Sequence, residues 1–203
     1  MVGADLLLLP NCNPITTPDQ DPAVLKPGQS QHGFSIHGQG GDSRNTEGME
    51  TFIADWTYAY RRGVGNGLDL GLKVTEGLFF IIPSGAQLDV KYQLPGMPFP
   101  VSADMAVGLH GGDFWSRTDG NLGTETLTLT PSLMLGHPRF YGGLRLDILD
   151  SPGGSDSPRY LPGLTLGTAL GKNHQLAPEA VLYWNRGGPG FMAGLSWRWK
   201  HGG

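Results

Sequence analysis

The chain has 203 residues, of which 16% are charged and 38% hydrophobic, and both shares are low for a water-soluble globular protein. The net charge of −4 is mild, so the composition does not favour nucleic acid as a partner. No apolar run reaches the roughly 20 residues of a membrane-spanning helix, so any crossing of a bilayer must be made by strands. The 33 Gly and 16 Pro indicate many turns.

Residues 1–32 are rich in proline and show almost no alternation of apolar and polar residues. This composition is typical of an extended arm, which we expect to be a tail or a partner-binding strap rather than a plug, because few of its residues are bulky enough to fill a lumen. Cys12 is the single cysteine, so no internal disulfide is possible. Leu6–Leu9 is too short for the core of a signal peptide, and we expect any export signal to have been removed.

Residues 33–199 alternate apolar and polar side chains in segments bounded by Gly, Pro, Asn and Asp, which is the pattern of β-strands. The segment Gly33–Gly40 is weak, whereas Thr51–Arg61 is the clearest. The remaining segments cover about residues 68–75, 86–94, 101–110, 126–135, 140–149, 160–170, 175–184 and 191–199. We therefore predict an all-β, antiparallel, up-and-down barrel of about ten strands, with 8 or 12 as alternatives.

The residue composition of the two strand faces indicates whether the barrel is surrounded by water or by lipid. A soluble barrel should show water a face rich in Lys and Glu, but the polar face here is mostly Gly, Ala, Thr and Ser. The other face carries Leu, Val and aromatic residues without charges, as expected if a charge facing lipid costs about 2–4 kcal/mol. The pattern predicts a transmembrane barrel with an apolar exterior and a polar lumen. Its interfacial aromatics would be Tyr58, Tyr60, Trp184, Trp197 and Trp199.

The connections between segments alternate in length. Short ones lie near Gly65, Gly96, Pro138 and Asn173, and long ones near Gly41, Ile81, Arg117 and Gly154. Outer-membrane barrels have short periplasmic turns and longer outer loops, so this rhythm predicts that both chain ends are periplasmic. One long connection holds an apolar run that either extends the strands or contacts lipid or a partner: Leu78, Phe79, Phe80, Ile81 and Ile82.

The last strand carries a recognisable motif. Gly194-Leu195-Ser196-Trp197-Arg198-Trp199 resembles the C-terminal signal of bacterial outer-membrane proteins, a glycine followed by two aromatic residues at alternate positions. The resemblance implies a bacterial outer-membrane barrel whose Gly194, Trp197 and Trp199 are read by the barrel-assembly machinery. Chains of that family usually stop on the last aromatic, whereas this one continues through residues 200–203, which we expect to form a short tail.

Three prolines, Pro131, Pro162 and Pro178, fall in the middle of predicted strands. Each lacks the N–H group that a strand donates to its neighbour. We expect bulges or bends in the strands at these positions.

Eleven charged residues of nearly balanced sign face the predicted lumen: Asp55, Arg61, Asp69, Lys73, Asp89, Lys91, Asp104, Arg145, Asp147, Glu179 and Arg198. We expect them to form ion pairs that fill the lumen, because an unpaired buried charge is costly. The alternative is a narrow pore with a charged constriction. Inward-facing glycines leave room for such a pore: Gly71, Gly108, Gly143, Gly163, Gly167 and Gly194.

No motif for catalysis stands out. His110 near Asp113 is the nearest candidate, but it lacks a neighbouring nucleophile or acidic pair. His32 and His37 do not form a zinc-binding pattern, and we expect no metal and no cofactor. We predict a non-enzymatic outer-membrane protein that is a membrane scaffold or a subunit of an envelope assembly. It would contact lipid and bind an envelope protein through its arm or loops; a diffusion pore is the alternative, and a protease or lipid hydrolase ranks third.

Overall fold

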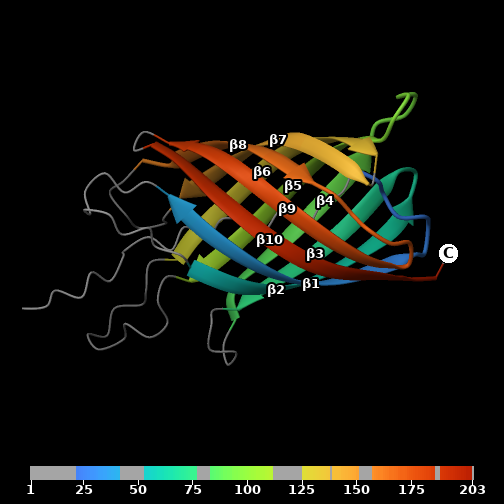
Figure 1. Ribbon diagram of the computed structural model, residues 1–203, viewed down its shortest axis with the longest axis horizontal. Coiled ribbons are helices and arrows are strands. Elements are labelled where there is room, and N and C mark those ends of the chain that lie inside the picture. The colour runs from blue at the N-terminus through green and yellow to red at the C-terminus, as the bar shows by residue number, and fades with distance from the viewer. Residues whose placement is uncertain are drawn as a thin grey trace, which may run out of the picture.

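The computed structural model describes residues 22–41, 53–76, 83–111, 125–137, 139–150, 157–185 and 188–202. These residues form ten strands: β1 (Ser30–Gly41), β2 (Ile53–Gly65), β3 (Leu68–Glu76), β4 (Pro83–Gln93), β5 (Val101–Gly111), β6 (Glu125–His137), β7 (Phe140–Asp150), β8 (Arg159–Gly167), β9 (His174–Asn185) and β10 (Gly188–His201). Each strand pairs antiparallel with its neighbours in sequence, and β1 pairs with β10 to close the barrel (Figure 1). The predicted all-β antiparallel up-and-down barrel of ten strands is confirmed. In these ranges no helix is long and apolar enough to cross a membrane.

The closing seam runs the full length of β1 and most of β10, from Ser30 opposite His201 to Gly41 opposite Gly190. The barrel therefore extends beyond the limits of 33 and 199 read from the sequence. Lys200 lies inside β10 rather than in a tail, because its backbone pairs with Gln31. Likewise, the end of the predicted arm supplies the first residues of β1, where alternation is too short to be seen.

The alternation of side chains follows the predicted faces. Along β3 and β4, Leu72 and Leu88 are 41% and 65% exposed, whereas the intervening Lys73 is 3% exposed and Gln87 is 4%. The lumen is thus lined by the polar set, and the apolar set covers the outside of the barrel. A soluble protein would hide the apolar set in its core, so the barrel is inverted relative to a soluble fold.

The mid-strand prolines interrupt the ladders without shifting their register. The β6–β7 ladder skips Thr130 and Pro131 and then resumes in the same register. The β8–β9 ladder covers only Gly163–Gly167, with Pro162 next to one end and Pro178 next to the other. The described register shifts lie elsewhere, between Gly63 and Gly65 in β2 and between Thr75 and Glu76 in β3. The expected bulges are therefore absent at these prolines, where the ladders skip residues or stop instead.

The two ends of the barrel differ. At the turn end lie the β2–β3, β4–β5, β6–β7 and β8–β9 connections, the start of β1 and the end of β10 (Figure 1). Asn66 and Gly67 form the two-residue β2–β3 turn, and both have positive φ, as such a hairpin turn requires. At the opposite loop end, the segments 42–52, 77–82, 112–124 and 151–156 lie outside the described residues, and with them the predicted contact segment Leu78–Ile82.

Closure of the barrel can be tested at the seam. Ser35 and Ser196 face each other across β1 and β10. We expect the Ser35→Cys/Ser196→Cys variant, with Cys12→Ser, to form a disulfide on mild oxidation, because directly opposite strand residues lie within bonding reach. The measurement is mass spectrometry of proteolytic peptides before and after reduction.

The matched control is Ser35→Cys/Arg198→Cys, which is out of register by two residues and should cross-link far less. Equal yields from the two variants would contradict the register of the seam.

Candidate functional site: the packed lumen

The structure places the eleven predicted charged residues on the inner face of the barrel. All are buried except Asp55, which is half-buried opposite His37 towards the loop end. Four acid–base pairs form among them: Arg61–Asp89, Lys91–Asp69 at 3.8 Å, Arg145–Asp147 at 2.7 Å and Arg198–Glu179 at 2.7 Å. Lys73 and Asp104 complete the set, and Asp104 stands opposite Lys91 in the β4–β5 ladder.

The Arg61–Asp89 pair joins strands that are not neighbours. Arg61 on β2 stands opposite Gly71 on β3, and Gly71 stands opposite Asp89 on β4. A Cβ on Gly71 would lie 2.5 Å from both carboxylate oxygens of Asp89. The guanidinium therefore reaches the carboxylate only because the intervening residue has no side chain.

The same arrangement recurs around Glu179. Tyr141 on β7 stands opposite Gly167 on β8, which stands opposite Glu179 on β9. The Tyr141 hydroxyl donates a hydrogen bond to Glu179 Oε1 across this glycine. The same carboxylate oxygen accepts from Arg198 at 2.7 Å, and Arg198 Nε donates to Ser196 Oγ at 3.1 Å. Glu179 thereby ties β7, β9 and β10 together inside the lumen.

A third glycine row brings a cation against an aromatic ring. Gly163 on β8 separates Arg145 on β7 from Tyr183 on β9, and the Arg145 guanidinium carbon lies 5.8 Å from the centre of the Tyr183 ring. Asp147 Oδ1 accepts hydrogen bonds from both the Arg145 guanidinium and the Thr130 hydroxyl, at 2.7 and 2.6 Å. Tyr141, Tyr183 and Thr130 were not among the predicted site residues, although the same period of two marks them as inward-facing.

The room that the inward glycines leave is occupied. A Cβ added to any of the six would lie 3.1 Å or less from a neighbouring side chain: Asp89 at Gly71, Thr128 and His110 at Gly108, Met134 at Gly143, Arg145 and Tyr183 at Gly163, Tyr141 at Gly167, and His37 at Gly194. The glycines are thus contact points for large lumen side chains, which take up the room that the sequence predicted beside them.

Apolar side chains fill the part of the lumen lined by β6–β10. Towards the loop end, Leu149, Leu161, Val181, Tyr183 and Met192 form one buried cluster. A second cluster lies nearer the turn end and consists of Met134, Tyr141, Ala169 and Ala177. Apolar surface offers water no hydrogen bonds, so these two clusters disfavour water on that side of the lumen.

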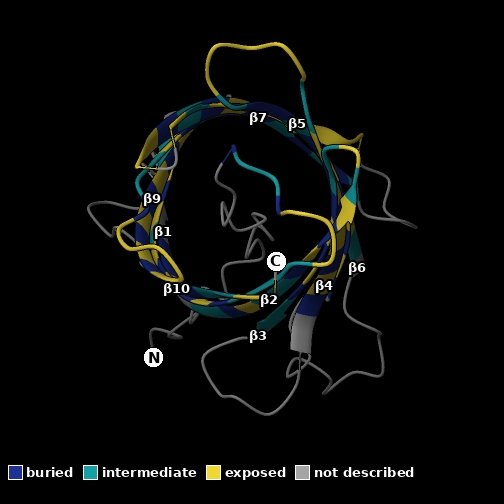
Figure 2. Cartoon of the chain, turned by 90° about the vertical axis from the view of Figure 1, so that its right-hand side faces the viewer, coloured by how far each residue is buried: buried dark blue, intermediate teal, exposed yellow. Residues whose placement is uncertain are grey.

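The turn-end mouth holds a piece of the predicted arm. We call Pro22–Gln29 the insert; Figure 2 shows it lying inside the ring of strands, ahead of β1. The insert is anchored to the barrel by Asp69, whose two carboxylate oxygens each accept the Leu25 N–H at 3.0 Å, and by Lys91 Nζ, which donates to the Ala23 carbonyl at 2.7 Å. Residues 22–29 of the predicted arm are therefore held at the mouth by backbone groups, which a prediction argued from side-chain bulk did not consider.

Below the mouth, a small hollow of about 20 Å³ remains, enough for about one water molecule. Three cationic side chains and one carboxylate line it: Arg61, Lys73, Arg198 and Asp89.

The candidate catalytic histidine lies in the lumen. His110 is 8% exposed and faces Gly85 across the β4–β5 ladder, one residue before the end of β5. Its suggested companion Asp113 lies outside the described residues. Among the described residues, no three His, Cys, Asp or Glu side chains are grouped to hold a metal ion.

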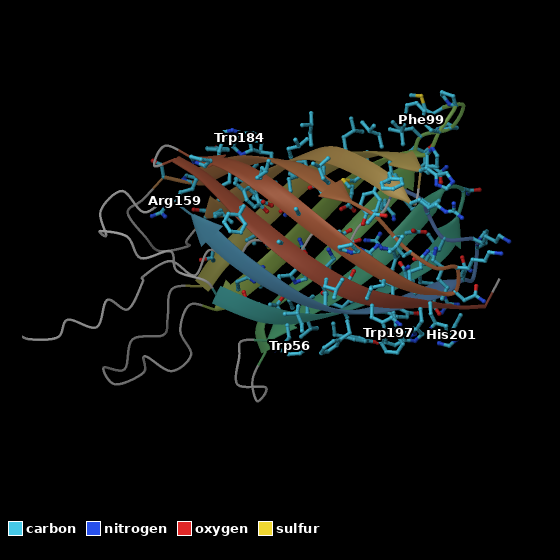
Figure 3. All side chains as sticks on the ribbon, in the orientation of Figure 1. Trp56, Phe99, Arg159, Trp184, Trp197 and His201 are labelled. Carbon is cyan, nitrogen blue, oxygen red and sulfur yellow. The ribbon has the colours of Figure 1, made fainter. Side chains whose placement is uncertain are left out.

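The exterior has an aromatic residue cluster at the turn end. His32 stacks on Trp199 with ring centres 5.4 Å apart, contacts the Tyr58 hydroxyl at 2.7 Å, and Trp199 packs against Trp197 at 4.8 Å. Trp184 lies near the loop end, opposite to Trp197 and His201 (Figure 3). Of the motif residues, Trp197 and Trp199 therefore face outwards, and Gly194 faces inwards against His37.

No protein-family model matches the chain, and no curated protein matches it. Several solved structures are similar in shape at low sequence identity. The attachment invasion locus protein Ail of Yersinia pestis, in complex with the heparin analogue sucrose octasulfate, is 10% identical, with 86% of this chain and 99% of that chain covered and a TM-score of 0.33. The translocator domain of the autotransporter NalP from Neisseria meningitidis is 10% identical over 86% and 89%, with a TM-score of 0.46.

Neisserial surface protein A is 14% identical, with 86% of this chain and 97% of that chain covered and a TM-score of 0.31. These sequence identities and TM-scores are low, so the function is inferred below from the surfaces and contacts of the chain itself.

The packing of the lumen predicts that adding one methyl group at Gly167 lowers the stability of the barrel. Gly167→Ala would place a Cβ 2.5–2.7 Å from the Tyr141 ring and hydroxyl, which are held by Glu179. We expect the free energy of unfolding to fall by about 1–3 kcal/mol, the usual cost of overpacking. Urea unfolding of the reconstituted protein, followed by tryptophan fluorescence, measures it.

Gly33→Ala is the matched control, because its Cβ would meet only ordinary contacts at 3.6 Å and beyond. If the two variants unfolded at the same urea concentration, the lumen would not be packed as described.

Proposed function

We propose that the chain is an integral protein of the bacterial outer membrane whose barrel has no open channel and acts as a membrane scaffold or as a subunit of an envelope assembly. The observation that carries this proposal is the filling of all six inward-glycine positions by neighbouring side chains. A solute that entered the lumen would have to displace these buried contacts and the ion pairs behind them.

The membrane location is supported by the exterior of the barrel. Large apolar side chains are exposed on every strand from β1 to β10, including Leu88 at 65% and Leu144 at 63%. Water-soluble monomers rarely expose a continuous apolar surface of this kind, whereas a bilayer solvates it. The closed sheet also leaves no unpaired strand edge for lipid to meet.

The orientation in the membrane follows from the two ends. The start of β1 and the end of β10 lie together at the turn end, which in outer-membrane barrels is periplasmic. This arrangement supports periplasmic termini. It also supports recognition of β10, through Gly194, Trp197 and Trp199, by the barrel-assembly machinery, because both tryptophans are on the outer face.

The lumen chemistry supports a non-enzymatic role. The buried acids that could act in hydrolysis are already engaged: Asp89 with Arg61, Asp147 with Arg145, and Glu179 with Arg198. A general acid or base must reach its substrate, and these groups are enclosed. The four ion pairs are thus best explained as the packing that holds the barrel rigid.

Conductance separates the scaffold from a diffusion pore. We expect the purified, folded protein to give no stepwise current in planar lipid bilayers, because its lumen is filled. Two controls make an absence of current interpretable. Protease protection in vesicles shows that the protein has inserted, and a porin of known conductance shows that the bilayer can report a channel.

Reproducible current steps, proportional in number to the protein added, would overturn the scaffold and favour the pore.

A further inference from the structure

The insert is held at the mouth almost entirely through its backbone. Asp69 accepts the Leu25 N–H with both oxygens, Lys91 donates to the Ala23 carbonyl, and the Gln93 side-chain oxygen accepts the Val24 N–H at 3.4 Å. An acidic and a basic side chain on adjacent strands therefore engage an N–H and a C=O group two residues apart. Every extended peptide presents such groups, whatever its sequence.

The end of β2 adds two backbone hydrogen bonds to these contacts with the insert. Gly63 donates its N–H to the Gln29 carbonyl and accepts the Gly28 N–H, both at 2.9 Å. The register of the β2–β3 ladder shifts between Gly63 and Gly65. A Cβ on Gly63 would collide with the carbonyl groups of Leu25 and Lys26, so glycine is what lets another chain approach this edge.

Two apolar positions give the mouth some selectivity. Leu25 is 6% exposed, and Pro22 is among the fully buried side chains. Beyond Leu25, Lys26, Pro27 and Gly28 are exposed to solvent. The site thus takes two apolar residues of an extended backbone and makes few demands on the residues that follow.

From these contacts we infer that the turn-end mouth is a binding site for an extended peptide, with the protein's own insert as its occupant in this structure. The site consists of Asp69, Lys91, Gln93 and the backbone of Gly63. Because the contacts are non-covalent and lie at the open end of the barrel, a separate peptide of the same backbone chemistry can replace the insert. This goes beyond a scaffold role, since it gives the barrel a place to hold a polypeptide.

The exchange is measured by cysteine labelling of the full chain in detergent, on a Cys12→Ser background. A reporter cysteine replaces Leu25, and its rate of reaction with a maleimide reports how often the insert leaves. We expect Asp69→Asn to raise this rate roughly tenfold or more, because a charge-assisted hydrogen bond is lost.

Two controls accompany this variant. Lys26→Ala changes an exposed side chain of the insert and should leave the labelling rate as it was. A cysteine at Met97, exposed in the β4–β5 turn, should react at the same rate with and without Asp69→Asn, which shows that the barrel stays folded.

The decisive step adds a synthetic peptide of residues 22–29 to the reporter protein with Asp69 intact. A peptide that occupies the mouth keeps the tethered insert out, so the labelling rate of the reporter should rise with peptide concentration, about twofold when the concentration equals the peptide's Kd. The control is the same peptide N-methylated at the leucine, which lacks the N–H group whose hydrogen bond Asp69 accepts. We expect it to leave the labelling rate unchanged at concentrations on the order of mM, the effective concentration of a tethered segment.

A rate that stays flat with the unmodified peptide, or that rises equally with the N-methylated one, would overturn the peptide site.

Discussion

The structure depends on filling a closed tube with polar side chains that pair with one another. Closing the sheet uses most backbone hydrogen-bonding groups of the strands, so an inward charge finds its partner mainly among the other inward side chains. Neighbouring strands place most of these side chains side by side, but Arg61 and Asp89 are two strands apart. An inward glycine between them removes the obstacle, and the rows through Gly163 and Gly167 repeat this solution.

This constraint links the interior to the role of the protein. The lumen is packed by the Arg61–Asp89 ion pair across Gly71, by ion pairs within β7 and between β9 and β10, and by apolar clusters on the side of β6–β10. A packed lumen suits the proposed scaffold, which would bind its partners through its outer surface, loops and mouth. The mouth differs from the rest of the lumen, because Asp69 and Lys91 direct part of their bonding capacity to a segment outside the sheet.

Much of the fold was predictable from the sequence, because a period of two is a direct consequence of strand geometry. Leu72 outside and Lys73 inside follow from that period alone, as do the number of strands and the antiparallel topology. The charged lining was likewise visible, since each of its eleven charges fell on the face opposite the one that is rich in Leu, Val and aromatic residues.

The partners of these charges were not predictable, because pairing depends on the stagger between strands. Nothing in the sequence says that Arg61 meets Asp89 rather than the nearer Asp69. The inward glycines were misread for the same reason, since their neighbours come from other strands. The insert was missed because its main chain, which every sequence shares, makes the contacts.

The orientation of the two faces is tested most directly in lipid vesicles whose acyl chains carry a photoactivatable diazirine. The unmodified protein is irradiated, and the labelled residues are identified by mass spectrometry. We predict adducts at outward positions in the middle of the barrel, such as Leu72, Leu88 and Val107, and none at the intervening Lys73, Gln87 and Ala106. Adducts on the second set, or no alternation along β3, β4 and β5, would contradict a barrel that faces lipid with its apolar side.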